Sequence, residues 1–272
     1  MNIINREPYP SDIDDETYAF ILPYLLFQVQ DDPRRKYSIR EVLNAMLWIV
    51  RTGSQWKYLP HGFPPYKIVH QQVMFWFQRK CFEDILSDLR VLERNRNLKN
   101  DNPTVIIIDS RTLRSTPQSG HRAGYDGGKK INGTKIHIAV DTLGNLITLI
   151  ATPANEQDRD QLYDLCKQVQ EITDNNVDIV IADQGYTGEQ ADIDAVLNNM
   201  ELIIVKRSEK EKGFVLLPKR WIVERTLAWF SKFRRLGRDL EKLASTLVGF
   251  HIVAASILLI NKLSPILGFL DG

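Results

Sequence analysis

Runs of β-branched residues in the second half of the sequence constrain the fold more than any other feature. TVIIID (residues 104–109) and VDIVIAD (177–183) have the composition of buried strands. Three further runs also predict strands, KIHIAVD (135–141), LITLIAT (146–152) and ELIIVK (201–206), and a Leu-Gly-Asn turn makes the first two a hairpin. Segments of helical periodicity alternate with the later strands. This order predicts an α/β fold with a mixed five-stranded sheet flanked by helices.

The first hundred residues have helical periodicity instead. IREVLNAMLWIVRTG (39–53) shows it most clearly, with an apolar face that ends at a glycine. Short helices joined by tight turns are compatible with a helix-turn-helix DNA reader and equally with a helical cap on the second domain. The charged, amide-rich stretch ERNRNLKNDNP (93–103) has the composition of a linker. We therefore expect a small all-α N-terminal domain at residues 1–97 and a second domain at 98–272.

Composition and cysteine usage exclude several classes of protein. The two cysteines, Cys81 and Cys166, lie far apart without metal-ligand spacing, so a disulfide or a thiolate zinc site is not expected. The N-terminus lacks the apolar core of a secretory signal. The long apolar run LVGFHIVAASILLI (247–260) is too short to span a bilayer and is predicted as a buried helix. We expect a cytoplasmic protein without a membrane partner.

Positive charge is concentrated in one part of the chain. The whole chain has a formal net charge of +1. From Lys206 to Arg238, however, eleven Lys or Arg residues face three acids, an excess of eight positive charges. Such a run is often only a solvated face. Within a nearly neutral chain it also indicates a local site for a polyanion such as nucleic acid.

Two of the predicted buried strands end in an aspartate, Asp109 and Asp183. The carboxyl ends of strands are where α/β proteins usually bind ligands. For either residue alone, a helix cap or a turn is the ordinary alternative. Two such ends in one domain favour two-metal phosphoryl transfer, because Mg²⁺ takes oxygen ligands and two ions about 3.5–4 Å apart can serve the attacking and the leaving oxygen. That chemistry calls for a third carboxylate from another element.

Glu224 is the candidate for this third carboxylate. WIVERTLAWFSKFRRLGRDL (221–240) is predicted as one amphipathic helix, with Phe230 and Phe233 on its apolar face and Glu224 nearly opposite, among arginines. The spacing of Arg220 and Glu224 allows an i,i+4 ion pair worth only about 0.2–0.5 kcal/mol, which alone would explain the glutamate. The same surroundings suit a site where metal and phosphodiester meet, because arginine binds phosphate by bidentate hydrogen bonds.

Taken together, these segments resemble the DDE transposases of bacterial insertion sequences. The resemblance rests on Asp109, on DQGY (183–186) and on WIVERTLAWFSKFRR with Glu224, in the family's order, and it covers nearly the whole chain. REVLNAMLWIVRTGSQWKYLPHGFPPY (40–66) is similar to the family's helical N-terminal domain. The resemblance implies an RNase H-like catalytic fold. It also implies that Asp109, Asp183 and Glu224 are catalytic and bind two Mg²⁺ or Mn²⁺ ions per active site.

The resemblance further implies a reaction and partners. The protein would cleave double-stranded DNA at terminal inverted repeats and transfer the freed 3′-OH end into target DNA. A homodimer would assemble on the DNA, and the protein would associate with the nucleoid when bound. Two alternatives remain open, a domesticated metal-dependent nuclease of the same fold and a non-catalytic, sequence-specific DNA-binding derivative.

The residues around the glutamate depart from the family pattern at two positions. Many relatives carry a Tyr–Arg–Glu–Lys signature, and Arg220 matches its arginine. Leu217 stands at the Tyr position and Ser231 at the Lys position, with a lysine one residue beyond. An exposed Trp221 would offer a surface for base stacking, with a core or interface role as the alternative. The predicted DNA contacts are Arg220, Trp221, Arg225, Lys232 and Arg235, with surface solvation as the alternative for the charged residues.

Overall fold

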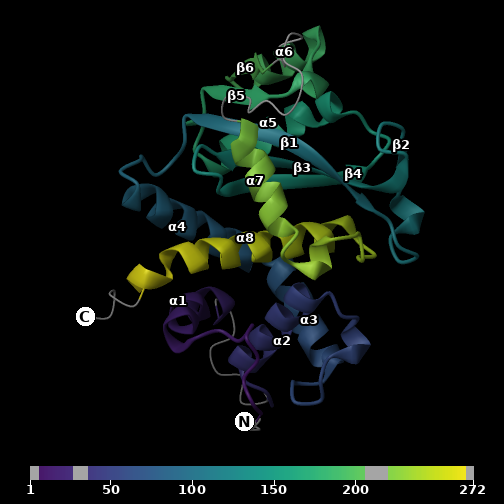
Figure 1. Ribbon diagram of the computed structural model, residues 1–272. Helices are drawn as coiled ribbons and strands as arrows, with labels where there is room; N and C mark the ends of the chain where they lie inside the picture. The colour runs from purple at the N-terminus through teal and green to yellow at the C-terminus, as the bar shows by residue number, and fades with distance from the viewer. Residues whose placement is uncertain (1–5, 27–35, 206–219, 268–272) are drawn as a thin grey trace.

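Six strands form one mixed sheet in the computed structural model, which describes residues 6–26, 36–205 and 220–267 (Figure 1). The sheet follows the order β4-β3-β1-β5-β6, and the short β2 also pairs with β3. β3 runs antiparallel to its partners, whereas β1, β5 and β6 run parallel to one another. This is the RNase H-like α/β arrangement that we expected. The strands are β1 (Val105–Arg114), β2 (Gly124–Asp126), β3 (Ile131–Asp141), β4 (Leu146–Pro153), β5 (Ile179–Ala182) and β6 (Glu201–Ile204).

Two features of the sheet differ from the prediction. β1 continues to Arg114 because β3 keeps pairing with it as far as Gly133, so its polar second half forms a strand despite lacking an apolar run. The strand β2 was not predicted, because it has only three residues and lies in a glycine-rich segment. Both differences depend on pairing with β3, which local sequence does not report.

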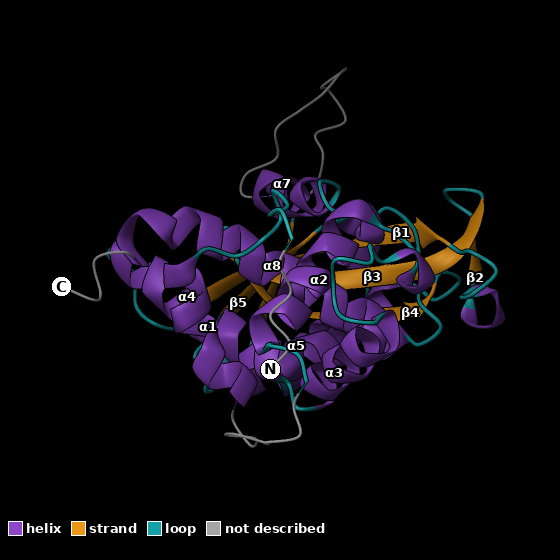
Figure 2. Ribbon diagram, turned by 90° about the horizontal axis from the view of Figure 1, so that it is seen from below, coloured by secondary structure: helices purple, strands orange, loops and turns teal. Residues whose placement is uncertain are grey.

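Helices cover both faces of the sheet (Figures 1 and 2). Successive residues of a strand point to opposite faces, so Ile106 and Ile108 pack toward α5 (Leu162–Ile172) and α6 (Glu189–Leu197). Ile107 points the other way, into a core shared with α7 (Arg220–Phe230) and α8 (Ala244–Leu267). The first of the helical segments expected between the later strands begins with a 3₁₀ turn, η3 (Asp158–Gln161), and continues as α5.

The N-terminal helices pack against the far side of α8. They are α1 (Asp15–Leu26), α2 (Ile39–Thr52), α3 (Tyr66–Gln78) and α4 (Cys81–Arg96). The side chain of Ser38 accepts a hydrogen bond from the Glu41 backbone N–H and so caps α2, which ends at Gly53 in the left-handed conformation (φ 70°). α4 lies alongside α8. One buried core extends from Ile21 of α1 to Leu263 of α8 and to the face of the sheet that α7 and α8 cover.

The predicted helix over residues 221–240 is wrong in its second half. α7 ends at Phe230, and a 3₁₀ turn, η5 (Arg234–Leu236), follows. Backbone N–H groups from Ser231 to Phe233 bond carbonyls three residues back, which tightens the chain out of the helix. Phe233, just before this turn, and Leu236, at its end, are both buried in the core.

α8 is the predicted buried helix, confirmed and extended to 24 residues. Its segment Ala244–Ser264 is long and apolar enough to cross a membrane by length and composition alone. Most of this segment, 61% of its most apolar window, is buried inside the protein against the helices and β4. Its apolar composition is therefore accounted for by the core.

Candidate active site

Asp109 and Asp183 lie side by side, on β1 and directly after its neighbour β5, but the prediction that Asp109 ends its strand is wrong, because β1 continues past it to Arg114 in its pairing with β3. β1 and β5 are parallel with Ile107 opposite Ile181, so the two aspartates, each two residues further on, come out level with each other. β5 ends just before Asp183, whose Oδ1 accepts a hydrogen bond from the Gly185 backbone N–H at 2.8 Å and caps the turn η4 (Gln184–Tyr186). Asp183 therefore both caps a turn and lies beside Asp109.

Asp109 is the more buried of the two, with its side chain 13% exposed. Its Oδ1 accepts a hydrogen bond from the Ser110 backbone N–H at 2.8 Å. Burial, together with the nearby carboxylates of Asp183 and Glu224, raises the pKa of Asp109 to about 6 despite the lowering effect of Ser110 and Arg220. The ionised form of this cluster is therefore stabilised by a cation.

α7 supplies both that cation and the third carboxylate. One nitrogen of Arg220, Nη2, lies 3.2 Å from Oδ2 of Asp183, 3.5 Å from Oε1 of Glu224 and 3.8 Å from Oδ2 of Asp109. The predicted pair between Arg220 and Glu224 is present, but the guanidinium also reaches both aspartates. The structure thus brings all three predicted acids around one point.

The chemistry of this site fits a hard divalent cation. Mg²⁺ and Mn²⁺ prefer oxygen ligands, and three carboxylates here already surround one positive charge. Within the described ranges, no three His, Cys, Asp or Glu side chains stand close enough to hold an ion as they are. With the guanidinium between the carboxylates, binding of an ion requires Arg220 to move aside.

The predicted DNA contacts fall into two groups. Arg220, Trp221 and Lys232 are partly or fully exposed near the site, with Trp221 38% exposed. Arg225, which is partly buried, and Arg235, which is buried, already have partners within the protein. The Arg225 guanidinium lies between the rings of Trp221 and Trp229, and that of Arg235 is buried in an ion pair with Glu241 at 2.6 Å. Five of the eleven basic residues of the predicted patch, those in residues 206–219, lie outside the described residues.

A fourth acid, Asp158, lies near the site and was not among the predicted residues. Its Oδ1 accepts a hydrogen bond from Ser110 Oγ at 2.8 Å and lies 3.0 Å from Nζ of Lys135. His137 is fully buried, with Nε2 3.0 Å from Thr152 Oγ1. A signal for Asp158 was present, since this acid follows a predicted strand by a few residues, as Asp109 and Asp183 end theirs.

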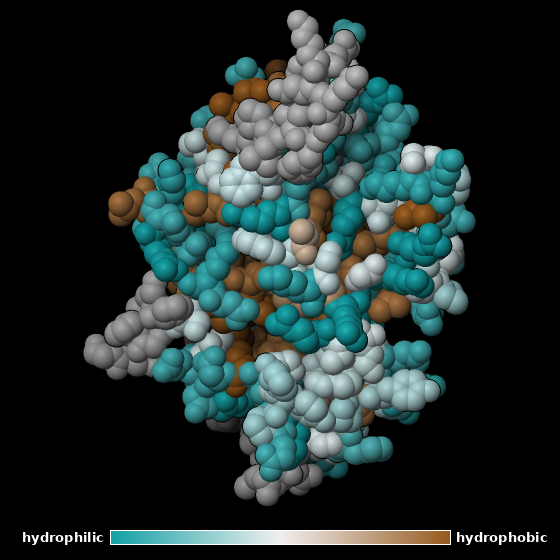
Figure 3. All heavy atoms as spheres, viewed as in Figure 1, coloured by the Kyte–Doolittle hydropathy of each residue, from teal (hydrophilic) through white to brown (hydrophobic). Residues whose placement is uncertain are grey.

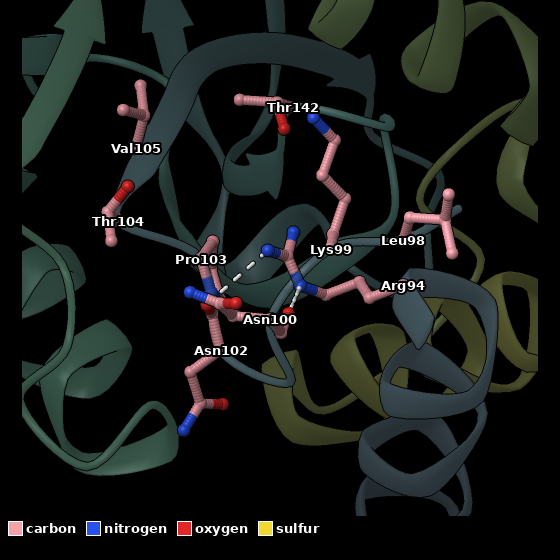
Figure 4. Close-up of a pocket in the computed structure, with 9 residues that line it drawn as sticks. All are labelled: Arg94, Leu98, Lys99, Asn100, Asn102, Pro103, Thr104, Val105 and Thr142. Atoms are coloured by element: carbon pink, nitrogen blue, oxygen red, sulfur yellow. Dashed lines mark hydrogen bonds between the residues drawn. The ribbon is translucent and has the colours of Figure 1, made fainter. Parts of the chain in front are cut away.

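The cavities beside the predicted linker do not belong to this site. A cavity of 290 Å³ lies at the opposite, N-terminal end of β1, and Arg94 projects into it from α4 (Figure 4). Arg94 Nε donates to the Asn100 carbonyl at 2.6 Å and Nη2 to the Asn102 carbonyl at 3.3 Å. These bonds hold the predicted linker against α4.

Hydrophilic side chains cover most of the face on which α7 lies (Figure 3).

Comparison with known families gives two matches. Residues 100–259 match the family described as "Transposase DDE domain", and residues 13–86 match "Putative transposase of IS4/5 family". A Burkholderia cepacia protein described as "Putative transposase for insertion sequence element IS402" is 36% identical over 118 residues, which cover 41% of this chain and 56% of that protein. An uncharacterised protein of Sinorhizobium fredii, y4sN, is 27% identical over 90 residues, covering 33% of this chain and 66% of its own. The chain thus spans between half and two thirds of these relatives.

Solved structures also show a distant likeness. The Mos1 transposase paired-end complex with left transposon end has a TM-score of 0.27 and 13% identity, over 65% of this chain and 62% of that one. The Mos1 mariner paired end complex with Mn has the same TM-score and 10% identity, over 88% and 81%. This TM-score is too low to establish a shared fold.

Proposed function

The chain belongs to the family of transposases with a DDE domain, and we propose that it cuts double-stranded DNA at the terminal inverted repeats of an insertion sequence and joins the freed 3′-OH end to target DNA. The observation that carries this proposal is the convergence of Asp109, Asp183 and Glu224 on one cationic group. Phosphoryl transfer on DNA uses clustered carboxylates beside donors that bind phosphate, and this site contains both.

Asp109, Asp183 and Glu224 would hold Mg²⁺ or Mn²⁺, two ions per active site. When bound, such ions supply activation of the attacking oxygen and stabilisation of the leaving oxygen in an in-line displacement. The protein's contribution is rigid placement. Two of the carboxylates stand on β1 and directly after its neighbour β5, and the third on a helix docked against the sheet, so ordered elements of the fold support all three.

Arg220 connects these carboxylates to the DNA. Its guanidinium has five N–H donors in a planar fork that matches the geometry of phosphate. Once positive charge from elsewhere balances the carboxylates, this fork can turn to the scissile strand. Trp221 would offer a face for base stacking and the exposed Lys232 a charge for phosphate. Arg225 and Arg235 would contact DNA only after leaving their present partners.

The two parts of the chain would then divide the work. Residues 98–272 would carry out the chemistry, and the helices of residues 1–97 would read the terminal repeats. Joining two ends to one target requires two active sites, so we propose a homodimer assembled on DNA at the nucleoid.

The proposal is tested by removing one charge at a time. Asp109→Asn, Asp183→Asn and Glu224→Gln should each reduce strand cleavage to background while leaving binding to repeat DNA unchanged, because each change keeps the shape of the side chain and removes a ligand oxygen's charge. Asp192→Asn, on the exposed side of α6, is the matched control and should cleave like the unchanged protein. Cleavage is measured on labelled repeat DNA with Mg²⁺ or Mn²⁺.

Two further measurements separate the alternatives. Pre-cleaved ends supplied with target DNA should give joined products, whereas a nuclease of the same fold would give none. Calorimetric titration with Mn²⁺ should show binding, and its absence would favour a DNA-binding derivative without catalysis. Full cleavage by any of the three variants would remove that residue from the active site.

A further inference from the structure

A second polar cluster lies directly behind the carboxylates, on the other face of the sheet. Asp109 faces α7, so its neighbour Ser110 points to the opposite face, where its Oγ donates to Asp158 Oδ1 at 2.8 Å. The same oxygen lies 3.0 Å from Lys135 Nζ and 3.8 Å from His137 Nδ1, both on β3. One carboxylate oxygen thus contacts side chains from the middle of β1 and from β3.

Asp158 also lies against the turn that carries Asp183. A side-chain carbon added to Gly185 would meet Oδ1 of Asp183 at 3.0 Å and Oδ2 of Asp158 at 3.2 Å. Because Gly185 has no side chain, the carboxylates of Asp183 and Asp158 can both lie close to its Cα. Asp158 is in contact with the residue after one catalytic aspartate and with the turn after the other.

Tyr186, next along this turn, supports the same arrangement. Its ring is fully buried and its hydroxyl has no hydrogen-bond partner among the described residues. Burial raises the pKa of Tyr186 well above its ordinary value, and the charges of Asp158, Asp109 and Asp183 add to the rise. All three aspartates therefore lie around one buried phenol, with Asp158 exerting the largest charge effect.

We propose that Asp158 is a positioning residue, which holds Asp109 on β1 and Asp183 after β5 at a fixed separation through Ser110, Lys135 and the Gly185 turn. This inference rests on the proposed function, because the separation matters only if both aspartates bind ions. Partners of this kind, one step removed from a metal site, typically change metal affinity or activity 10–100-fold when they are removed.

An Asp158 that only capped η3 or paired with Lys135 would have different consequences. Such a residue would affect stability, but it would leave the affinity for ions and the cleavage rate of the folded protein unchanged. Lys135 already donates to the Glu156 carbonyl at 2.7 Å, so it keeps one partner when Asp158 is removed. The two roles can therefore be separated by measurement.

The test uses the full chain with Asp158→Ala, Asp158→Asn and the control Asp160→Asn, an exposed aspartate two residues further on. Asp158→Ala should weaken Mn²⁺ binding and lower kcat for cleavage about 10–100-fold, with an unchanged KM for repeat DNA. Asp158→Asn keeps an oxygen that can accept from Ser110 and should recover most of both. Asp160→Asn should match the unchanged protein, and thermal unfolding is recorded for each.

A double variant identifies the route of the effect. If Asp158 acts through Ser110, adding Ser110→Ala to Asp158→Ala should cost less than Ser110→Ala costs alone. Full additivity would overturn the proposed route through Ser110.

The remaining outcomes separate this inference from the proposed function. If the unchanged protein binds Mn²⁺ and cleaves DNA while Asp158→Ala does the same, the positioning role is refuted and the proposed function stands. Equal losses in Asp158→Ala and Asp158→Asn, with unfolding unchanged, would instead make Asp158 a direct ligand of the ion. If the unchanged protein neither binds Mn²⁺ nor cleaves DNA, both proposals fail.

Discussion

Arg220 and the carboxylates around it define the chemistry of this protein at the scale of single residues. Three carboxylates share one guanidinium nitrogen at 3.2 to 3.8 Å, so each is only partly compensated. Burial raises the pKa of Asp109, and the charges of Asp183 and Glu224 add to this rise, so the acids repel one another. Arg220 and a divalent ion would therefore compete for the same oxygens.

We predict that Arg220→Ala binds Mn²⁺ more tightly than the unchanged protein in the absence of DNA. Removing the guanidinium leaves three mutually repelling carboxylates, and an ion that enters relieves this repulsion without displacing an arginine. Calorimetry at pH 8, where Asp109 is ionised, measures the effect, and Arg220→Lys, which keeps the charge, should lie nearer the unchanged protein. Weaker binding in Arg220→Ala would show that the arginine supports the ion instead of competing with it.

At the scale of elements, the docking of α7 on the β3–β4 hairpin decides where Glu224 stands. Gly144 takes a positive φ of 83° in the hairpin turn, and a side chain there would collide with Arg225. Thr226 Oγ1 donates to the Gly144 carbonyl at 2.7 Å, and Arg225 Nη2 donates to the Leu143 carbonyl at 2.9 Å. The Arg225 guanidinium stacks 4.7 Å from the centres of two indole rings, Trp221 and Trp229.

Arg225→Met should therefore act on stability. Loss of the stacked cation and its hydrogen bond should lower the free energy of unfolding by about 1–3 kcal/mol. Lys232→Met, which changes an exposed residue, should leave unfolding unchanged and weaken DNA binding, with a smaller dependence on salt. Urea denaturation and DNA binding at two salt concentrations distinguish the two residues. An Arg225 variant of unchanged stability with weakened DNA binding would favour the phosphate contact expected from sequence.

At the scale of the whole molecule, α8 joins the N-terminal helices to the sheet. His251 lies at its centre, fully buried, with its Nδ1–H donating to the Leu247 carbonyl at 2.8 Å and its ring edge-on to Phe230 of α7. Burial lowers the pKa of His251 to about 3. The folded protein therefore keeps this histidine neutral at pH values where the unfolded chain protonates it.

Stability should consequently fall as the pH falls. The unfolded chain binds a proton below about pH 6.5 and the folded protein only near pH 3, so His251 should cost about 2 kcal/mol between pH 7 and pH 5. Denaturation of the unchanged protein and of His251→Leu at both pH values measures this difference. The variant should lose less stability on acidification, whereas His61→Leu, at an exposed position, should not alter the pH dependence. Equal pH dependence in His251→Leu would exclude this source.

Local patterns in the sequence account for the five longer strands, for the buried helix α8 and for the aspartate that directly follows β5. Such features are encoded within a few residues, since β-branched runs favour strands and a parallel pair brings its carboxyl ends to one edge. The same patterns could not report the end of α7 at Phe230, because the carbonyls of Leu227 and Leu236 on either side of it accept hydrogen bonds from Arg111, a residue of the distant strand β1.

The sequence by itself thus determined which residues could form a metal-binding site and which fold could carry them. The tertiary structure decided which partners each of those residues contacts. It placed one nitrogen of Arg220 among three acids, withdrew Arg235 into an ion pair with Glu241 and brought Asp158 behind Asp109. Each of these contacts joins elements far apart in the chain, and periodicity within one element contains no information about its neighbours.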